Sequence, residues 1–378
     1  MESFLREKLR SLSERGLLRD SGDRGRAQAT AAARRLCLPM IDAATNDYYS
    51  LASEELAATP SRVGAGAARL VHGTDPRHLT LEHTLADWVG LPSALVFPSA
   101  FAANVGLLQA LVSPDDHVVS ARANHASLID GIRLSKARTT IVDALDPTEM
   151  RAALGAPSPG RRWLVLESYY SMDGVSPDLV AARGAADEYG AALIVDEAHA
   201  LGVFGPHGGG LCREAGIVPD ALTGGFGKAI GTQGGFVAGT DQLREVLWNC
   251  ARPFVFSTGT SPALAEVTRL HVERLKHSPE LRQRLLDNSR RLRSSLEVAG
   301  LPLVPGSHGP IVAVVAGSEE RAMRAAHACR EQGILVQAIR PPTVPENGSR
   351  LRIAVKADFD EEALRRIVSA VEAAWDES

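Results

Sequence analysis

A short apolar run, Leu193-Ile194-Val195, ends at Asp196, and this is the feature that most restricts the fold of the chain. A short run of β-type residues is typical of a buried strand. In open α/β sheets, polar groups and bound ligands collect at the carboxyl ends of the strands. The run therefore predicts a strand of such a sheet, with Asp196 at a binding site.

The rest of the chain alternates between strands and helices. In its first part, strands are expected at 93–97, 117–120, 139–142, 163–167 and 192–196, with helices between them. This alternation predicts a mostly parallel sheet that helices cover on both faces.

The pattern changes after a long helix that is expected to begin near Pro262. Beyond it we expect a helix that ends at 299, strands at 311–315, near 335 and at 351–355, and helices at 319–332 and 361–375. The prediction is an α/β protein with a helical segment at 1–45, a large mostly parallel-sheet domain at 46–260, and a smaller α+β domain at 261–378.

Composition and charge exclude several classes of protein. A formal net charge of −4 on 378 residues argues against nucleic acid as the main partner. The four cysteines are far apart and form no C-x-x-C pair, which indicates free thiols in a reducing compartment and no zinc or other metal site. Leu5, Leu9, Leu12 and Leu17-Leu18 lie at helical spacing among charges, so an amphipathic helix and not a signal peptide is expected to open the chain. No apolar run is long enough to span a membrane, and we expect a soluble, cytoplasmic protein without a membrane partner.

Two further residues extend the site at Asp196. His199 follows three residues later, and Lys228 lies between small residues farther along. Pyridoxal 5′-phosphate (PLP) needs a lysine amine for its Schiff base and an acid that keeps its ring nitrogen protonated. A nearby carboxylate stabilises the charged ring, which then acts as an electron sink. The three residues together predict a PLP site.

Short motifs along almost the whole chain point to one family. They are Asn46-Asp47-Tyr48, Gly73-Thr74 with His78 and Glu82, Phe101-Ala102-Ala103-Asn104, Asn124-His125-Ala126-Ser127, Ser171-Met172-Asp173-Gly174, Asp196-Glu197-Ala198-His199, Lys228, Phe256-Ser257-Thr258 and Arg350-Leu351-Arg352. In these motifs the chain resembles the α-oxoamine synthases. The resemblance implies the PLP-dependent transferase fold type I and a reaction that condenses an amino acid with an acyl-CoA and releases CO2.

The resemblance also implies roles around the cofactor. The Ala100 and Phe101 amides would bind the phosphate, and Asn104 would lie close to the ring. His125 would stack on the ring face. His199 would hydrogen-bond the phenolic oxygen, with Ser171 near it.

Further roles concern the substrate and a second subunit. Lys228 would hold the cofactor and later serve as the general base. Arg352, assisted by Asn46, would grip the substrate carboxylate. Ser257 and Thr258 match a segment that reaches the phosphate of the neighbouring subunit, which implies a homodimer with shared active sites.

One position departs from the family pattern. The family commonly has Thr or Ser three residues before the lysine, where the hydroxyl binds phosphate, and Gly225 stands there in this chain. We expect one charge-assisted hydrogen bond fewer, worth about 1.5–3 kcal/mol, unless Thr223 replaces it.

The substrates are expected from local similarity. Residues 337–345 are most similar to the members that form 8-amino-7-oxononanoate in biotin biosynthesis, which implies L-alanine and pimeloyl-CoA or a carrier-protein thioester. Ala68 and Leu70 offer no side-chain hydrogen bond to a succinyl group, and the segment that contains them is closer to the 2-amino-3-ketobutyrate CoA ligases. The acyl donor therefore stays open. An aminotransferase of the same fold and a non-catalytic PLP-fold binding protein are the alternatives from other classes.

Overall fold

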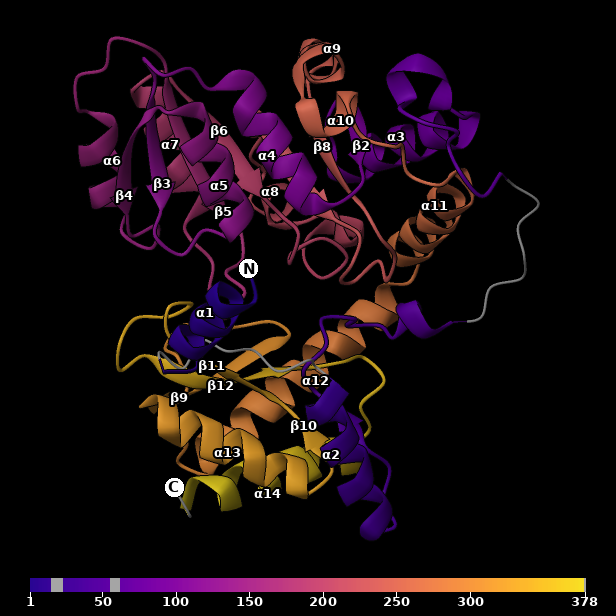
Figure 1. The fold of residues 1–378 in the computed structure, drawn as a ribbon, viewed down its shortest axis with the longest axis vertical. Coiled ribbons are helices and arrows are strands. Elements are labelled where there is room, and N and C mark those ends of the chain that lie inside the picture. Colours follow the sequence, from indigo (N-terminus) through magenta and orange to yellow (C-terminus); the bar gives the residue numbers. More distant parts are fainter. Residues whose placement is uncertain (15–22, 55–61, 377–378) are drawn as a thin grey trace.

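The computed structural model describes residues 1–14, 23–54 and 62–376, and its larger part is built on a seven-stranded sheet (Figure 1). The strands are β2 (Ser93–Phe97), β3 (His117–Ala121), β4 (Arg138–Val142), β5 (Arg162–Glu167), β6 (Ala191–Asp196), β7 (Ala221–Gly225) and β8 (Gly235–Gly239). Their order is β2-β8-β7-β6-β5-β3-β4. The strands from β7 to β4 are parallel to their neighbours, and β8 is antiparallel to β7 and to β2. The predicted α/β fold with a mostly parallel sheet is confirmed.

Helices cover both faces of this sheet. They are α3 (Pro76–Val89), α4 (Ala100–Leu111), α5 (Ala126–Ser135), α6 (Pro147–Leu154), α7 (Leu179–Glu188), α8 (Leu211–Glu214), α9 (Asp241–Cys250), α10 (Arg252–Val255) and α11 (Pro262–His277). Leu193 and Val195 of β6 share a core with α3, α6, α7 and α11, whereas Ile194 packs with α4, α5 and α9. Burial on both faces explains why this strand is an uninterrupted apolar run.

The smaller part contains a three-stranded antiparallel sheet in the order β11-β12-β9. Its elements are β9 (Ile311–Gly317), β11 (Gln337–Ile339), β12 (Ser349–Ala354), α12 (Pro279–Val298), α13 (Glu319–Glu331) and α14 (Glu361–Asp376). The N-terminal α2 (Asp23–Arg35) packs on α13, and β1 (Ile41–Asp42) pairs in parallel with β10 (Ile334–Leu335). Residues from both ends of the chain therefore share one core, whereas α11 belongs to the core of the larger part. The exact division into three domains stays a prediction.

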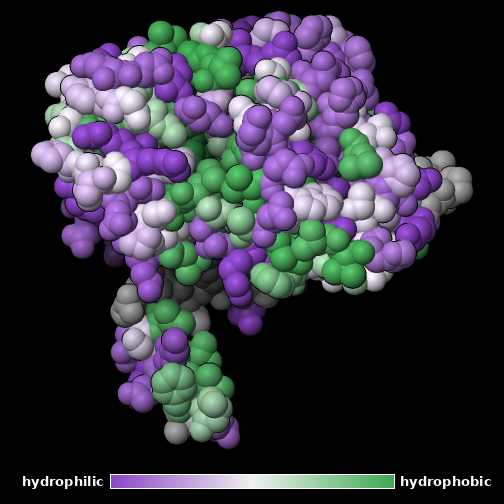
Figure 2. Space-filling model, turned by 90° about the horizontal axis from the view of Figure 1, so that it is seen from above, coloured by the Kyte–Doolittle hydropathy of each residue, from purple (hydrophilic) through white to green (hydrophobic). Residues whose placement is uncertain are grey.

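The first helix, α1 (Glu2–Glu14), projects from the body with Phe4, Leu5 and Leu9 exposed (Figure 2). Leu17 and Leu18 of the predicted amphipathic helix lie outside the described residues. Short helical turns are η1 (Leu51–Ser53), η2 (Arg69–Gly73) and η3 (Pro206–Gly208). No helix in the described ranges has the length and apolar character needed to cross a membrane.

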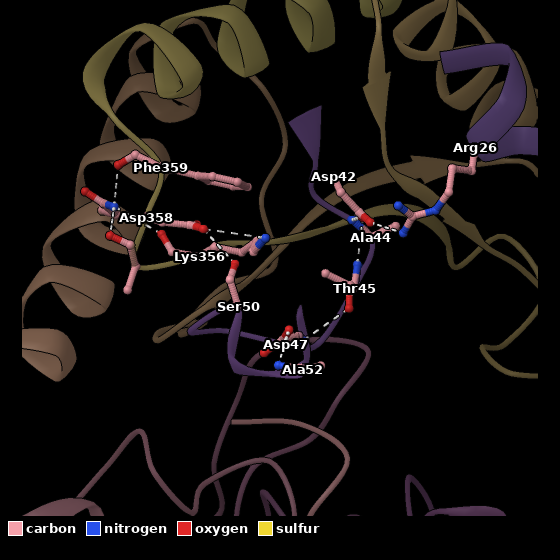
Figure 3. A network of polar contacts seen from close by, with 12 residues as sticks. Arg26, Asp42, Ala44, Thr45, Asp47, Ser50, Ala52, Lys356, Asp358 and Phe359 are labelled. Carbon is pink, nitrogen blue, oxygen red and sulfur yellow. Dashed lines mark hydrogen bonds and ion pairs between the residues drawn. The ribbon is translucent and has the colours of Figure 1, made fainter. Parts of the chain in front are cut away.

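Residues 42–52 cross from the smaller part to the larger one, and polar contacts fix their course (Figure 3). The Thr45 hydroxyl accepts a hydrogen bond from the Asp47 amide at 3.2 Å. Ser50 donates to the Asp358 carboxylate at 2.6 Å, which ties the segment to the chain before α14. The motif that follows Thr45 is thereby held at the junction of the two parts.

Candidate active site

Asp196 lies at the carboxyl end of β6, as predicted, and two donors fix its carboxylate. The Asn104 side-chain amide donates to Oδ2 at 2.7 Å, and the Ala198 amide donates to Oδ1 at 2.8 Å. Asn104 also donates to the Ser127 hydroxyl at 2.9 Å. Asn104, which the resemblance implied to lie near the ring, therefore orients the acid. A carboxylate held in this way can pair with a protonated ring nitrogen.

Lys228 follows β7, and its amine is buried near the same strand end. Burial lowers the pKa of the amine, and the carboxylates of Asp196 and Glu167 oppose this effect. A Cβ placed at Gly225 would lie 4.0 Å from the Lys228 Nζ, so the amine is directed back towards the end of β7. A buried amine with a lowered pKa has its lone pair available for a carbonyl group.

The N-terminus of α4 faces the same region. The Ser99 hydroxyl accepts the Ala102 amide at 3.0 Å, whereas the Ala100 and Phe101 amides precede the first intrahelical hydrogen bonds. A Cβ at Gly225 would lie 3.1 Å from the Ala100 Cβ, so Lys228 and this helix end are close together. Free amides at a helix N-terminus favour a phosphate.

His125 begins α5, and its ring is held from several sides. Ring Nδ1 lies 2.8 Å from the Ser127 hydroxyl and accepts the Ser127 amide at 3.2 Å. The Phe101 ring contacts it edge-on with centroids 6.5 Å apart. Burial lowers the pKa of His125. A fixed, neutral ring is suited to stacking on a planar cofactor.

Glu167 is a buried acid at the end of β5 that sequence reasoning missed. It is the register partner of Asp196, and it accepts the His125 amide at 2.5 Å. Burial raises the pKa of Glu167 to about 8, and the charge of Asp196 adds to this shift. The sequence could have indicated Glu167 as a site residue, because it ends a predicted strand just as Asp196 does.

Arg352 extends from β12 into the site and is almost completely buried. Its Nη2 donates to the Asn46 side-chain oxygen at 2.6 Å, and its Nε donates to the Ser171 carbonyl at 2.6 Å. The predicted pair of Arg352 and Asn46 is therefore assembled. Ser171, expected near His199, contacts Arg352 through its backbone. A guanidinium oriented by fixed acceptors is suited to hold a carboxylate.

Tyr48 lies between His199 and Arg352. In the sequence it was noted only as part of the motif Asn46-Asp47-Tyr48. His199 Nδ1 lies 3.0 Å from the Tyr48 hydroxyl. The charged Arg352 guanidinium lies near the same hydroxyl and lowers its pKa against the larger effect of burial. Burial, together with the charges of Lys228 and Arg352, holds the pKa of His199 well below its usual value. The imidazole is therefore neutral.

Ser257 and Thr258 make no side-chain hydrogen bond to this cluster among the described residues. They follow α10, with Thr258 exposed and Ser257 half-buried. The next residue, Gly259, donates to the Ala67 carbonyl at 3.1 Å. Within the described ranges no hydrogen bond joins either hydroxyl to Lys228. Their action on a partner subunit stays a prediction.

The residues of the cluster are suited to three chemical groups of PLP: the aldehyde, the ring nitrogen and the phosphate. The cluster offers an amine for the aldehyde, an acid for the ring nitrogen and free amides for the phosphate. Thr223, the register partner of Asp196, has a buried hydroxyl with no hydrogen-bond partner among the described residues. It lies two residues before Gly225 on the same strand. No group of His, Cys, Asp and Glu residues in the described part of the chain could hold a metal ion.

Comparisons with known proteins identify relatives over most of the chain. The sequence model of the family Aminotransferase class I and II matches residues 39–371. The 8-amino-7-oxononanoate synthase of Alkalilimnicola ehrlichii is 39% identical over 339 residues, covering 86% of this chain and 86% of that protein. A putative 8-amino-7-oxononanoate synthase of Desulforudis audaxviator is 38% identical over 369 residues, covering 94% of each chain.

Solved structures agree with this family relationship. Serine palmitoyltransferase of Sphingomonas wittichii is 29% identical with a TM-score of 0.84, covering 89% of this chain and 88% of that chain. A serine palmitoyltransferase solved with PLP is 28% identical, with the same TM-score and coverage. The 8-amino-7-oxononanoate synthase of Francisella tularensis is 24% identical with a TM-score of 0.76, covering 89% of this chain and 98% of that chain, and it supports the fold alone.

Proposed function

The chain belongs to the aminotransferase class I and II family, and from this premise we propose that it is a PLP-dependent α-oxoamine synthase. The proposed reaction joins an amino acid, L-alanine, to an acyl thioester, pimeloyl-CoA, and gives an α-amino ketone, free thiol and CO2. One observation carries the proposal. Asp196, Lys228 and Arg352 meet in a single buried cluster, in a chain 39% identical to a protein named 8-amino-7-oxononanoate synthase.

The amine and the acid have separate tasks in this reaction. When bound, PLP supplies an electron sink for the negative charge that develops at the amino acid Cα. Asp196 keeps the ring nitrogen protonated, because its carboxylate stabilises the positive charge. Lys228 would hold the cofactor through its amine, and the same amine in its neutral form would accept the Cα proton of the amino acid. The lowered pKa of this amine favours the form that can accept a proton.

Arg352 and Asn46 position the amino acid. A guanidinium binds a carboxylate with two parallel hydrogen bonds, which fixes the direction of the Cα–carboxylate bond. The buried setting of Arg352 excludes water from this contact. The carboxylate is held in this way until it leaves as CO2 after the new carbon–carbon bond has formed.

The identity of the acyl chain is the more specific part of the proposal. Ala68 and Leu70 offer no side-chain hydrogen bond, which suits an apolar chain whose methylenes contribute about 0.8 kcal/mol each on burial. A second candidate is another α-oxoamine synthase with a different acyl thioester. This alternative is favoured by the serine palmitoyltransferases among the solved structures.

We also propose a homodimer with shared active sites, located in the cytoplasm. Large hydrophobic side chains near the site segments are exposed, including Val71, Phe101 and Phe256. Hydrophobic residues gather in separate patches on the surface in Figure 2. Exposed apolar surface of this kind is typical of a protein interface.

The test is competition between acyl thioesters. Purified protein with PLP is incubated with L-alanine, glycine or L-serine and an equal mixture of pimeloyl-, acetyl-, succinyl- and long-chain acyl-CoA, and the products are identified by mass spectrometry. The proposal expects the ketone from L-alanine and pimeloyl-CoA. A preference for acetyl-CoA with glycine, or for a long chain with serine, would move the assignment within the family. Amino-group exchange with a 2-oxo acid and no thiol release would indicate an aminotransferase.

A further inference from the structure

Tyr48 is a completely buried side chain at the centre of the site, and its hydroxyl is its only polar side-chain atom. The hydroxyl lies 3.0 Å from His199 Nδ1, and the charged Arg352 guanidinium lies near it and lowers its pKa. The backbone of Tyr48 is fixed as well, because its carbonyl accepts the Ala357 amide at 2.9 Å. The Tyr48 hydroxyl thus lies between His199, which is expected at the cofactor, and Arg352, which is expected at the substrate carboxylate.

The direction of the hydrogen bond between Tyr48 and His199 follows from the chemistry of these groups. Arg352 is a cation with donors only, so the Tyr48 oxygen turns its lone pairs, and not its proton, towards the guanidinium. The single Tyr48 proton is then left for His199. Burial keeps His199 neutral, so its Nδ1 can accept this proton. A neutral imidazole that accepts at Nδ1 carries its own proton on Nε2.

We propose that Tyr48 is a positioning residue that fixes the Nε2–H tautomer of His199 and couples this donor to the carboxylate-binding Arg352. Nε2–H is the form that can donate to the phenolic oxygen of PLP. The inference rests on the proposed function for that last contact, whereas the tautomer itself is a property of the protein alone. A carboxylate drawn onto Arg352 would shift the charge at Tyr48 and hence the strength of the donor at His199.

The variant Tyr48→Phe keeps the ring and removes the hydroxyl. Tyr49→Phe is the matched control, because Tyr49 is also buried and its hydroxyl donates to the Gly202 carbonyl at 2.6 Å, away from His199. The main measurement is the pH at which the visible band of the PLP-bound protein changes. A donor at the phenolic oxygen favours the deprotonated form of the bound cofactor, so its loss should raise this midpoint by about one pH unit. Tyr49→Phe should leave the midpoint unchanged.

A second measurement needs no cofactor. Nitrogen-15 spectra of histidine-labelled protein report the tautomer of His199 directly, with the signal assigned by its loss in His199→Gln. The inference expects Nε2–H in the wild type and in Tyr49→Phe, and a mixture of tautomers in Tyr48→Phe. An Nδ1–H tautomer in the wild type, or an unchanged midpoint in PLP-bound Tyr48→Phe, would overturn it. A wild type that binds no PLP but shows the Nε2–H tautomer would contradict the proposed function and leave the positioning role of Tyr48 supported.

Discussion

Gly225 is the residue at which this site departs most clearly from its family, and the structure shows how much space the departure leaves. A Cβ there would lie 3.1 Å from the Ala100 Cβ and 3.5 Å from the Ala198 Cβ, so only a small side chain fits. Gly225→Ser should bind PLP about tenfold more tightly than Gly225→Ala, because both add the same Cβ but only serine adds a phosphate donor. Absorbance titration of the apo-protein measures both affinities. Equal affinities would show that other groups, such as Thr223, already satisfy the phosphate.

The role of Asp196 is testable by an isosteric change. Asp196→Asn should retain the fold and the bond between Lys228 and PLP, but lower kcat by roughly 100-fold or more, because a neutral amide cannot stabilise a protonated ring nitrogen. Borohydride reduction followed by peptide mass spectrometry shows whether PLP is still attached to Lys228. Near-normal turnover would mean that another acid serves the ring.

Single residues also show where sequence reasoning reaches its limit. The placement of Asp196 at a strand end, with His199 and Lys228 near it, could be predicted because the order of these three residues and their chemistry are specific. The contact between Tyr48 and His199 could not, because 151 residues separate them and only the fold brings them together. The hydrogen bond between the Ser171 carbonyl and Arg352 was likewise not predicted, because 181 residues separate the two, and the expected place of Ser171 near His199 stays a prediction.

At the scale of elements, the adjacent ends of β5 and β6 bring Glu167 beside Asp196 and make stability depend on pH. The pKa of Glu167 is raised from 4.5 to about 8 in the folded protein. Between these values the unfolded chain has released the proton that the folded protein keeps, so the free energy of unfolding falls as pH rises. The stabilisation is complete below about pH 4.5 and is lost by about pH 8.

Glu167→Gln should therefore flatten this dependence, since glutamine cannot ionise. The Tm of the apo-protein should fall less between about pH 5 and about pH 8 in the variant than in the wild type, by several degrees. Burial also raises the pKa of Glu197, to about 7, but this contribution is common to both proteins and cancels in the difference. Parallel Tm curves would show that Glu167 is ionised in the folded state.

The loop after β5 joins the two parts of the molecule, and Gly174 permits its close approach. Asp173 pairs with Arg350, and the Gly174 carbonyl accepts the His308 amide at 2.7 Å. Gly174 has φ +68°, and a Cβ there would overlap the Ile311 carbonyl oxygen. Gly190 has a similar φ of +60° and open space around it.

Comparing Gly190 with Gly174 distinguishes two costs of adding a side chain: the strain of a left-handed backbone, and the loss of the contact between the loop and the smaller part. Gly190→Ala should cost about 1 kcal/mol of stability, because only the left-handed backbone is penalised. Gly174→Ala should cost clearly more and should raise the KM for the amino acid, because the loop also supplies the Ser171 carbonyl to Arg352. Thermal unfolding and steady-state kinetics of the two variants give the comparison. Equal losses of stability would show that the loop can move away without cost.

Most strands of the seven-stranded sheet were predictable from the sequence, and the two that were missed share a cause. β7 and β8 contain Gly224, Gly225, Gly235 and Gly239, which weaken the β-type pattern. The glycine at 235 is required by packing, since a Cβ there would lie 2.5 Å from the Ala100 amide nitrogen. A requirement of this kind depends on the α4 N-terminus and cannot be read from the strand itself.

At the scale of the whole molecule, the site lies where the two parts meet. Asn46 comes from the crossing segment, Arg352 from the smaller sheet, and Asp196 from the larger one. Ser257 is half-buried and Thr258 is exposed, and both follow α10. If they bind the phosphate of a second subunit, each active site needs residues from both chains.

Mixed dimers test this arrangement. Lys228→Ala inactivates the active site that contains the lysine of the same chain. The double variant Ser257→Ala/Thr258→Ala would weaken the other active site, which contains the lysine of the partner chain. Random mixing of the two proteins makes half of the dimers mixed. In each mixed dimer a shared arrangement puts both defects into one site and leaves the other intact, so activity should recover to roughly a quarter of the wild-type value. If Ser257 and Thr258 act within their own chain, every site in the mixture carries one defect or the other, and mixing restores nothing. Size-exclusion chromatography with light scattering on the same samples shows that dimers have formed, and native mass spectrometry shows that they have exchanged, because the mixed dimer has an intermediate mass.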